Sequence, residues 1–563
     1  MAEWLCPFDE DKDVSMTSPA PTDSARLISD GRATLGIEFG STRIKACLIG
    51  DDFATIASGS FEWENEFVDG RWSYSIEAVR AGLQASYAAL VADVQAKFDV
   101  VPTTFAAIGI SAMMHGYIAL DAGGELLVPF RTWRNSSTGP AAAELSDALG
   151  FNIPLRWSIA HLYQAVLDDE PHVSEIASLT TLAGYVHHLL TGRNALGVGD
   201  ASGMFPIDPA TSSYDASMRQ IAQERLDAHT SGLDLAALLP EVLPAGADAG
   251  TLTDAGAALL DPTGTLRSGI PFCPPEGDAG TGMVATNSVA KRTGNVSVGT
   301  SIFAMVVLDE PLRAVHAELD VVTTPVGDAV AMVHCNNGAS ELASLARVFG
   351  RFSEASGAAT PMDDVYTTLF AEALEGDADA GGLLSFNYLA GEPVTDVEDG
   401  RPLFVRTPGS SFTLANLIRS EVFGAFATLS IGMEILADED VRVDRLLAHG
   451  GLFRTPGASQ QLLAAALGVP ITVETTASEG GAWGIAVLAA YLERASETTL
   501  AEFLDDEVFG GSEAVTVEPT PADEAGFAAY LERYRTALPL ERAAAAATPT
   551  RSNPTTPKEG AAS

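Results

Sequence analysis

The sequence predicts a two-domain α/β protein, and three observations support this prediction. The chain has 563 residues, which is enough for more than one hydrophobic core. Short strand-like segments alternate with longer amphipathic segments. A pair of strand-like segments joined by a Gly-[Ser/Thr] turn occurs twice, over residues 34–49 and again over residues 294–308. We therefore expect two domains of related architecture.

The first half opens with a β-β-β-α-β series. Gly40-Ser41-Thr42 separates the first two strand-like segments and suits a hairpin turn. Residues 78–98 repeat apolar positions every three and four residues, which predicts an amphipathic helix. The strands are expected at TLGIEF (34–39), RIKACLI (43–49), TIASGSFEW (55–63) and FAAIGISAM (105–113).

The second half repeats this opening before it continues with further strands and helices. Residues 294–308 again show a strand, a Gly-Thr-Ser turn and a strand. A long apolar helix is expected over residues 414–437. The other expected elements are strands at 329–338, 445–451 and 470–475 and a helix at 481–495.

The two ends of the chain differ in composition from the rest. Residues 1–32 are polar and contain Pro and Ser, and residues 546–563 form a Pro/Thr-containing tail after an alanine run. Such composition predicts loose order at both ends, with the alanine run as a possible helix end. The two domains are then expected at residues 33–274 and 275–545.

Charge and cysteine usage limit the classes of partner. The 75 acidic residues outnumber the 32 basic ones, and the formal charge of −43 excludes a general nucleic-acid surface. A nucleotide would have to arrive with a metal ion and meet local donors. The chain has four well-separated cysteines and no C-x-x-C pair, signal-peptide pattern or bilayer-spanning run. We expect a reduced, cytoplasmic protein with no membrane partner.

The two Gly-[Ser/Thr] turns are candidate phosphate sites. Gly40-Ser41-Thr42 and Gly299-Thr300-Ser301 each offer consecutive backbone N–H groups together with hydroxyls, and such turns bind anionic oxygens. Neither turn matches G-x-G-x-x-G or the P-loop pattern. Each could be an ordinary hairpin turn by itself. Two such turns on two domains could hold a triphosphate between them.

A glycine-rich loop carries the candidate catalytic acid. The segment PPEGDAGTGM (274–283) sets Asp278 among glycines, which allow a ligand to approach the backbone closely. An acid in such a loop can take the proton of a substrate hydroxyl, as in other phosphoryl-transfer enzymes. A plain Asp-Gly loop without function is the alternative.

Several further residues are candidate ligand contacts. His115 follows a buried strand, a usual place for ligand contacts in α/β folds, and a core histidine is the alternative. Trp133 and Asn135 offer an aromatic wall and an amide, which suit a polyol but would also suit an ordinary loop. Gly450-Gly451 after a strand and Gly481 at a helix start would let a flat base lie against the backbone. Tight helix packing is the alternative for these glycines.

Taken together, these segments resemble the FGGY carbohydrate kinases of the actin-like ATPase superfamily, from about Leu35 to about Glu493. The family's phosphate-1 turn G-I-D-x-G-[TS]-[TS] is similar to GIEFGST, and its catalytic loop G-G-G-D-N-x-x-G is similar to PEGDAGTG. Its phosphate-2 turn S-x-G-T-S is similar to SVGTS, and its adenosine segment to HGGLF and EGGAWGIA. The resemblance implies a two-domain, actin-like (ribonuclease H-like) fold with a cleft between the domains.

The resemblance also implies an activity, which is transfer of the γ-phosphoryl group of MgATP to a sugar hydroxyl. Asp278 would take the hydroxyl proton, and Glu38 and Asp278 would hold Mg²⁺ or its water. Lys45 matches a position where the family often has a basic phosphate contact. The two turns would hold the phosphates, and Gly450-Gly451 and Gly481 would face the adenosine. Relatives are often dimers, so a homodimer is implied.

The expected substrate follows from a branch of the family. MMHG (113–116) resembles the xylulokinase M-H-G, which makes Met114 and His115 substrate contacts, and GDASGMFPID (199–208) resembles a segment of the same branch. A ketopentose such as xylulose is therefore the first expectation. The xylulokinase W-N-D-x-R is WRNSS here, so Asn135 and Ser137 replace an acid and an arginine. A kinase for ribulose, an L-ketose or a sugar acid such as gluconate is thus an alternative, as is a non-kinase or non-catalytic relative.

Overall fold

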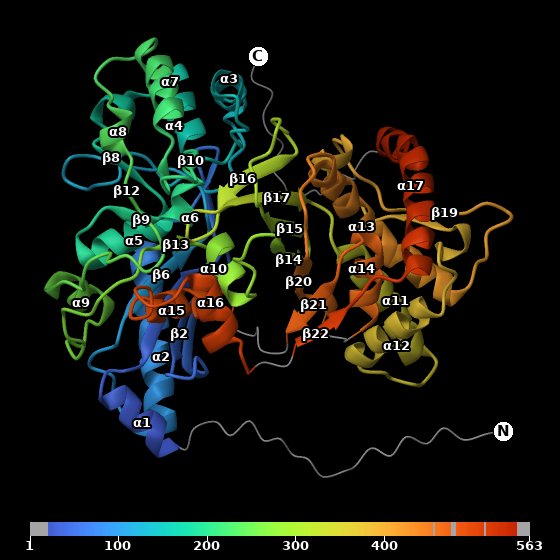
Figure 1. Ribbon diagram of the computed structural model, residues 1–563, viewed down its shortest axis with the longest axis horizontal. Helices are drawn as coiled ribbons and strands as arrows, with labels where there is room; N and C mark the ends of the chain where they lie inside the picture. Colours follow the sequence, from blue (N-terminus) through green and yellow to red (C-terminus); the bar gives the residue numbers. More distant parts are fainter. Residues whose placement is uncertain (1–20, 454–456, 475–479, 512–513, 549–563) are drawn as a thin grey trace.

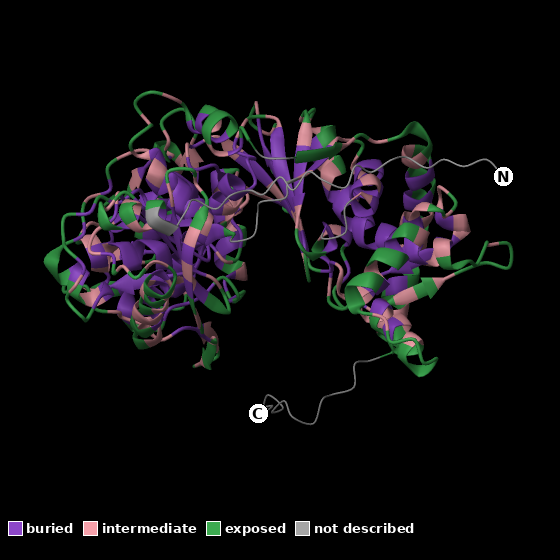
Figure 2. Ribbon diagram, turned by 90° about the horizontal axis from the view of Figure 1, so that it is seen from below, coloured by how far each residue is buried: buried purple, intermediate pink, exposed green. Residues whose placement is uncertain are grey.

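Two α/β bodies lie side by side, each built around one main sheet (Figure 1). The computed structural model describes residues 21–453, 457–474, 480–511 and 514–548. Each body has its own buried interior (Figure 2). We call the body that contains β1 the first body and the body that contains β14 the second body.

The first body contains a five-stranded sheet in the order β13-β6-β1-β2-β3. Its central strand pairs antiparallel with β2 and parallel with β6, and β13 extends the sheet in parallel beyond β6. The expected strands and the expected hairpin of this half are confirmed. Their bounds are β1 (Thr34–Phe39), β2 (Arg43–Ile49), β3 (Thr55–Glu62), β6 (Ile108–Ala112) and β13 (Glu276–Gly277).

The second body contains a seven-stranded sheet in the order β16-β17-β15-β14-β20-β21-β22. Its central hairpin, β14 and β15, is antiparallel, and β14 pairs parallel with β20, as β1 does with β6 in the first sheet. The repeated strand-turn-strand unit is therefore confirmed. The strands are β14 (Thr293–Val298), β15 (Ile302–Val307), β16 (Leu319–Thr323), β17 (Ala329–Cys335), β20 (Arg445–His449), β21 (Ile471–Glu474) and β22 (Ala514–Val517).

Two late helices return to the first body. Figure 1 shows α15 (Gly481–Tyr491) and α16 (Leu500–Phe503), in orange and red, beside the blue strands of the first sheet. The strand β1 approaches α15 so closely that a Cβ at Gly36 would overlap the Ala482 carbonyl oxygen. Gly484 meets Thr281 of α10 (Asp278–Ala285) in the same way. Five of the six residues of β1 are buried and the sixth, Glu38, is partly buried, as expected for a strand covered on both faces.

The remaining helices cover the two sheets and their outer edges. In the first body, α2 (Ile76–Phe98) packs on β2 and β3, starts at a Ser75 cap and ends in left-handed Asp99. Its other helices include α3 (Gly139–Leu149), α4 (Ser158–Leu167), α5 (Leu182–Thr191), α6 (Val198–Ala201), α7 (Ala216–Asp227), α8 (Leu235–Leu238) and α9 (Asp254–Leu260). The second body contains α11 (Ser340–Ala355), α12 (Met362–Leu374), α13 (Leu414–Asp438), α14 (Ala458–Leu467) and α17 (Pro521–Ala547).

Short strand pairs complete the two bodies. The pairs are β4 (Glu66–Val68) with β5 (Arg71–Ser73), β7 (Ile118–Leu120) with β8 (Ser178–Thr180), β9 (Ala195–Gly197) with β12 (Glu241–Leu243), β10 (Ile207–Asp208) with β11 (Ser213–Tyr214), and β18 (Leu384–Phe386) with β19 (Leu403–Val405).

The helix α13 is long and apolar enough to cross a membrane by length and composition alone. Its most apolar window is 72% buried inside the protein, against strands of the second sheet and the neighbouring helices α12 and α14. It is therefore a core helix of the second body.

The chain ends differ in part from the expectation of loose order. Residues 21–29 form helix α1 (Pro21–Ser29), which packs on α2 and buries Ile28, so the expectation is wrong for this stretch. The apolar Leu27-Ile28 pair within a polar stretch supplies the necessary buried face. The helix α17 takes in the alanine run as expected. The expectation for residues 1–20 and 549–563 lies outside the described residues.

The domain boundary expected at residues 274/275 stays a prediction. The strand β13, which follows it directly, pairs with β6 and so belongs to the first sheet. The catalytic-loop candidate Asp278 therefore starts α10 from the first body.

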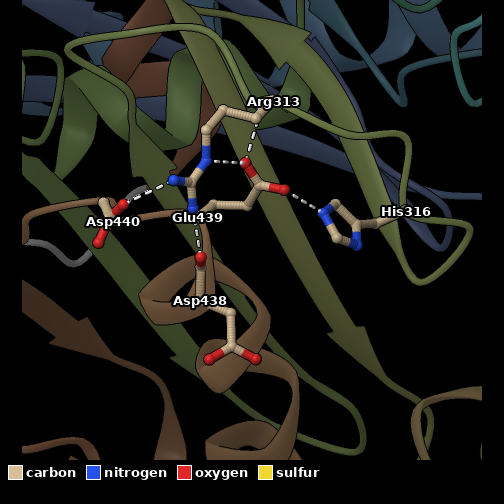
Figure 3. A network of polar contacts seen from close by, with 5 residues as sticks. All are labelled: Arg313, His316, Asp438, Glu439 and Asp440. Carbon is tan, nitrogen blue, oxygen red and sulfur yellow. Dashed lines mark hydrogen bonds and ion pairs between the residues drawn. The ribbon is translucent and has the colours of Figure 1, made fainter.

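A polar network fastens the loop between β15 and β16 to the end of α13 (Figure 3). Glu439 accepts hydrogen bonds from the backbone N–H of Arg313 at 2.7 Å and from His316 Nε2 at 2.6 Å. The guanidinium of Arg313 also pairs with Asp440 at 2.7 Å. This network fixes the chain just before β16, the edge strand that faces the first body.

Candidate functional site

The turn between β1 and β2 keeps its backbone carbonyls turned away from solvent. Trp63 donates to the Gly40 carbonyl through Nε1 at 2.7 Å and to the Thr42 carbonyl through its backbone N–H at 3.2 Å. The Tyr74 hydroxyl donates to the Ser41 carbonyl at 2.6 Å. The two rings stack with centroids 4.1 Å apart. Within the described part of the chain, the exposed N–H groups of Ser41 and Thr42 make no hydrogen bond, so they can bind an anion.

The turn between β14 and β15 has the same organisation. The carbonyls of Gly299 and Thr300 accept hydrogen bonds from the N–H groups of Ala339 and Gly338, at 2.8 and 2.7 Å. A side chain at Gly338 would overlap those carbonyl oxygens, so this backbone contact requires glycine. Thr300 and Ser301 again present N–H groups that bond to no described residue. Each body therefore offers one anion-binding turn.

Gly450 packs against Val298, the last residue of β14 before the second turn. Its φ of 110° is in the region that favours glycine, and a Cβ there would overlap the Val298 carbonyl oxygen. A Cβ at the next residue, Gly451, would meet no atom of the described residues within 4 Å. The structure thus brings Gly299-Thr300-Ser301 and Gly450-Gly451 together, with open space over Gly451.

Gly481 belongs to a different part of the site. It starts α15 directly over Glu38, and a Cβ there would overlap Glu38 Oε1. Glu38 also accepts a hydrogen bond from the backbone N–H of Ala482 and lies across the β1–β2 ladder from Lys45. Burial raises the pKa of Glu38 to about 7, Lys45 opposes that rise and Asp278 adds to it.

Asp278 stands at the start of α10 with an approach from solvent. Its Oδ1 accepts a hydrogen bond from the Met114 backbone N–H at 3.0 Å. The surrounding protein raises the pKa of Asp278, while the backbone N–H groups of Met114 and Ala279 and the charge of Arg156 oppose the rise. The raised pKa makes the carboxylate a better proton acceptor than an ordinary aspartate.

His115 lies on the loop after β6 and directly follows Met114, whose N–H binds Asp278. Its backbone φ is 72°, which is uncommon for histidine and marks a constrained loop. The ring stacks on Trp157, with centroids 6.4 Å apart, and Nδ1 lies 3.5 Å from the Gly203 carbonyl oxygen. Burial holds the pKa of His115 well below its usual range, so the ring is uncharged at neutral pH. The structure brings Met114, His115 and Asp278 together as expected.

Trp133 and Asn135 lie in different environments. Trp133 is 41% exposed, whereas Asn135 is buried. The Asn135 amide donates to the carbonyls of Trp72 and Thr132 at 2.8 and 3.0 Å and accepts from the Trp72 N–H at 2.9 Å. Both amide hydrogens are engaged by backbone, so the structure uses Asn135 to hold β5 and leaves it no donor for a substrate.

Sequence reasoning missed several residues around Asp278. Glu276 is 1% exposed and accepts the N–H groups of Gly199 and Asp200 at 3.3 and 2.9 Å. Asp200 accepts from Thr181 Oγ1 at 2.6 Å, and among the described residues its Oδ1 has no partner. Asp200 lay within the quoted GDASG segment, which was the available signal, but nothing near Arg156 in the sequence indicated a site.

A magnesium ion fits this arrangement only with help from a substrate. Among the described residues, no three His, Cys, Asp or Glu side chains gather so that they could hold a metal ion. Glu38 and Asp278 interact electrostatically and lie in the first body near its phosphate turn. Mg²⁺ is commonly bound by one or two carboxylates together with phosphate oxygens and water. Two carboxylates and a nucleotide would therefore suffice.

Family comparison now places this fold and site in a known class. Residues 33–284 match the N-terminal domain of the FGGY family of carbohydrate kinases, and residues 294–493 match the C-terminal domain of the same family. The chain belongs to the FGGY family of carbohydrate kinases. The expected fold class, a two-domain α/β protein of the actin-like kind, is confirmed.

Individual relatives share part of the sequence. The chain is 29% identical over 171 residues to a xylulose kinase of Streptomyces coelicolor, which covers 29% of this chain and 33% of the relative. It is 26% identical over 246 residues to a xylulose kinase of Streptomyces rubiginosus, which covers 40% of this chain and 45% of the relative. The aligned segments thus span less than half of either relative.

Solved structures agree over most of the chain but at low identity. A xylulose kinase from Rhodospirillum rubrum aligns with a TM-score of 0.73 and 19% identity, over 90% of this chain and 99% of that one. A gluconate kinase from Lactobacillus acidophilus gives 0.71 and 18%, over 90% and 98%. A glycerol kinase from Plasmodium falciparum with ADP gives 0.70 and 14%, over 90% and 98%. These similarities establish the fold and leave the substrate open.

Proposed function

We propose that this protein transfers the γ-phosphoryl group of MgATP to a hydroxyl of a sugar, with a ketopentose such as xylulose as the first candidate. The observation that carries the proposal is the placement of Asp278. Its carboxylate is held by the N–H of Met114, the residue before His115, and shares the first body with an anion-binding turn. Family membership and the xylulose kinase relatives support the choice of reaction and of first substrate.

The phosphate end of the site would be formed by the two turns. The free N–H groups of Ser41 and Thr42 from one body, and of Thr300 and Ser301 from the other, would bind phosphate oxygens. Lys45, on the strand that follows the first turn, would add a positive charge. Local donors are needed because the net charge of −43 repels a nucleotide at long range.

The nucleoside would lie over the second body. The space over Gly451, next to the second turn, would leave room for the adenosine, and Gly450 would allow the close backbone approach to Val298. Gly481 would contribute by admitting Glu38 to the start of α15. Its expected role in ATP binding would then be indirect.

Asp278 would act as the general base at the sugar end. Its raised pKa suits the acceptance of a hydroxyl proton during in-line attack on the γ-phosphoryl group. The neutral His115 ring would orient the sugar by hydrogen bonding without adding charge. Mg²⁺ held by Glu38, Asp278 and phosphate oxygens would neutralise charge on the transferring group.

A coupled assay of ADP release tests the proposal directly. Purified protein and MgATP are combined in turn with ketopentoses, alditols and aldonates, and sugar-dependent ADP production is expected for at least one of them. Asp278→Asn should lower kcat by about 10²–10⁴-fold while the protein stays folded and still binds ATP. ADP production that no sugar stimulates, or near-normal turnover by the variant, would refute the proposal.

An aldonate such as gluconate is the second candidate substrate. The structural similarity to a gluconate kinase supports it, as does Ser137 in place of the arginine of the xylulokinase pattern. The same panel of sugars distinguishes the two candidates.

A further inference from the structure

Arg156 lies where the sugar end of the site meets the second body. Its carbonyl oxygen accepts the Gly116 N–H at 3.1 Å, next to His115, and the following residue, Trp157, stacks on the His115 ring. The Arg156 guanidinium acts electrostatically on both Asp278 and His115. The side chain is 27% exposed, so a bound ligand could reach it.

The ionic partner of Arg156 comes from the other body. Asp320 on the edge strand β16 forms an ion pair with the Arg156 guanidinium, and the Asp320 side chain is only 14% exposed. In the antiparallel β16–β17 pair, Asp320 is opposite Met332 and therefore near His334, on which both Asp320 and Arg156 act. The Arg156 guanidinium thus forms an ion pair that links the two bodies.

Hydrogen bonds to the first body hold β16 in this place. Asn152 Nδ2 donates to the Leu319 carbonyl at 2.8 Å. The Thr323 N–H donates to Ser202 Oγ and Thr323 Oγ1 donates to the Val198 carbonyl, both at 3.0 Å. Asp320 lies between these anchors, so its carboxylate is held in register with Arg156.

The other arginines behind the sugar-side loop have contacts of their own. Arg131 and Arg71 both pair with Glu170. Arg134 stacks over the Trp72 ring at 4.3 Å and acts on Tyr74, which holds the first phosphate turn, so its charge belongs to the phosphate end. Of these arginines, Arg156 alone acts on both Asp278 and His115, and Asp320 cancels its charge.

We propose that Asp320 is a positioning and specificity-determining residue, which fixes Arg156 beside Asp278 and excludes sugars that carry a carboxylate. A neutral sugar needs only the hydrogen-bond donors of a fixed guanidinium. An aldonate carboxylate would lie near the Asp278 carboxylate and would need an uncompensated cation, which the ion pair removes. Asp320 of the second body would thus select for a neutral substrate, although the catalytic acid, Asp278, lies in the first body.

This inference rests on the proposed kinase activity, and Asp320→Asn tests it in the full chain. The variant keeps the shape of the side chain and removes the charge. We expect KM for the best neutral sugar to rise about tenfold, with KM for ATP and kcat within about twofold. We also expect the ratio of kcat/KM for an aldonate to that for the neutral sugar to rise by about tenfold or more.

Two control variants separate this role from a structural one. Asp320→Glu retains the charge and should keep the parental preference for the neutral sugar. Asp328→Asn removes another ion pair from the same strand pair, that of Asp328 with Lys291 at 3.3 Å, and should change neither KM. If Asp320→Asn does not fold, Asp320→Ser with the same two ratios replaces it.

The outcomes for the kinase and for Asp320 are distinguishable. Wild-type protein that turns over no sugar refutes the proposed function. Wild-type protein that prefers an aldonate, or an Asp320→Asn ratio equal to that of the parent, refutes the role of Asp320 and leaves the kinase intact. Equal increases in KM for sugar and ATP would also refute it, because they indicate general loosening of the structure.

Discussion

Glu38 has a partly buried carboxylate. Replacing Glu38 by glutamine should stabilise the folded protein above about pH 7 and should impair catalysis. Burial raises the pKa of Glu38 from an ordinary 4.5 to about 7. Between these two values the folded protein holds a proton that the unfolded chain has released, so the free energy of unfolding falls as pH rises. The loss of unfolding free energy caused by ionising the partly buried Glu38 is absent below pH 4.5 and complete above about pH 7.

The size of this effect follows from the two pKa values. At about 1.4 kcal/mol for each pH unit, the interval between 4.5 and about 7 corresponds to at most about 3 kcal/mol. Glutamine carries no charge, and its oxygen can still accept the hydrogen bond from Ala482. Relative to the parent, Glu38→Gln should therefore gain up to about 3 kcal/mol of unfolding free energy at pH 8 compared with its value at pH 4.

Urea denaturation in EDTA at pH 4, 6 and 8 measures this difference without any metal ion. The same variant should lose about 10–100-fold in Mg²⁺-dependent kcat, with a smaller change in ATP affinity. Glu38→Asp is the matched control, because it keeps the charge and shortens the reach to Ala482 by one methylene. Superimposable pH profiles of stability for parent and Gln variant would refute the reasoning, and an unchanged Glu38→Asp would show that the extra methylene has no function.

Three further predictions concern packing, the polar network and Asn135. Gly36→Ala should lower the unfolding free energy by about 3 kcal/mol in chemical denaturation, since its Cβ would overlap the α15 backbone, whereas Gly409→Ala, with open space, should be neutral. Equal stability of the two variants would contradict this close approach. Glu439 has its pKa lowered to about 2, chiefly by the hydrogen bond from His316, so it stabilises the fold above pH 4.5 and loses that contribution as pH falls to about 2. Glu439→Gln should therefore melt earlier than the parent at pH 7, with the difference vanishing near pH 2, and a constant difference would oppose this assignment. Asn135→Ala should cost about 1–3 kcal/mol in thermal unfolding with little change in sugar KM, and a selective rise in that KM would instead favour a substrate contact.

Much of the fold was accessible from local patterns. The segments at residues 34–39 and 43–49 are rich in apolar residues, which predicts strands. The three-residue turn between them sets their antiparallel register. The same reasoning located the second hairpin and the long helix α13. The start of the chain was misjudged at α1, because a short helix with one small apolar face is stabilised mainly by the helix it packs on.

The site was accessible only where its chemistry lies in contiguous residues. Asp278 and the two glycine turns could be recognised because a single short segment contains each of them. Trp63 and Tyr74 hold the carbonyls of Gly40 and Ser41 in the first turn. They lie 23 and 33 residues after these partners, and no sequence pattern links them to the turn. Asn135 was expected to face a substrate, yet its amide is engaged by the Trp72 backbone.

By itself, the sequence determined the two strand-turn-strand units, the alternation of strands and helices, and the acid that starts α10, because each depends on the order of neighbouring residues. Only the tertiary structure decided that α15 lies over β1, so that the Ala482 N–H meets Glu38, and that Asp320 crosses from the second body to Arg156. Burial and charge pairing depend on groups that are distant in sequence and close in space. They therefore set the pKa of Glu38 and the charge at the sugar end in a way that no local pattern contains.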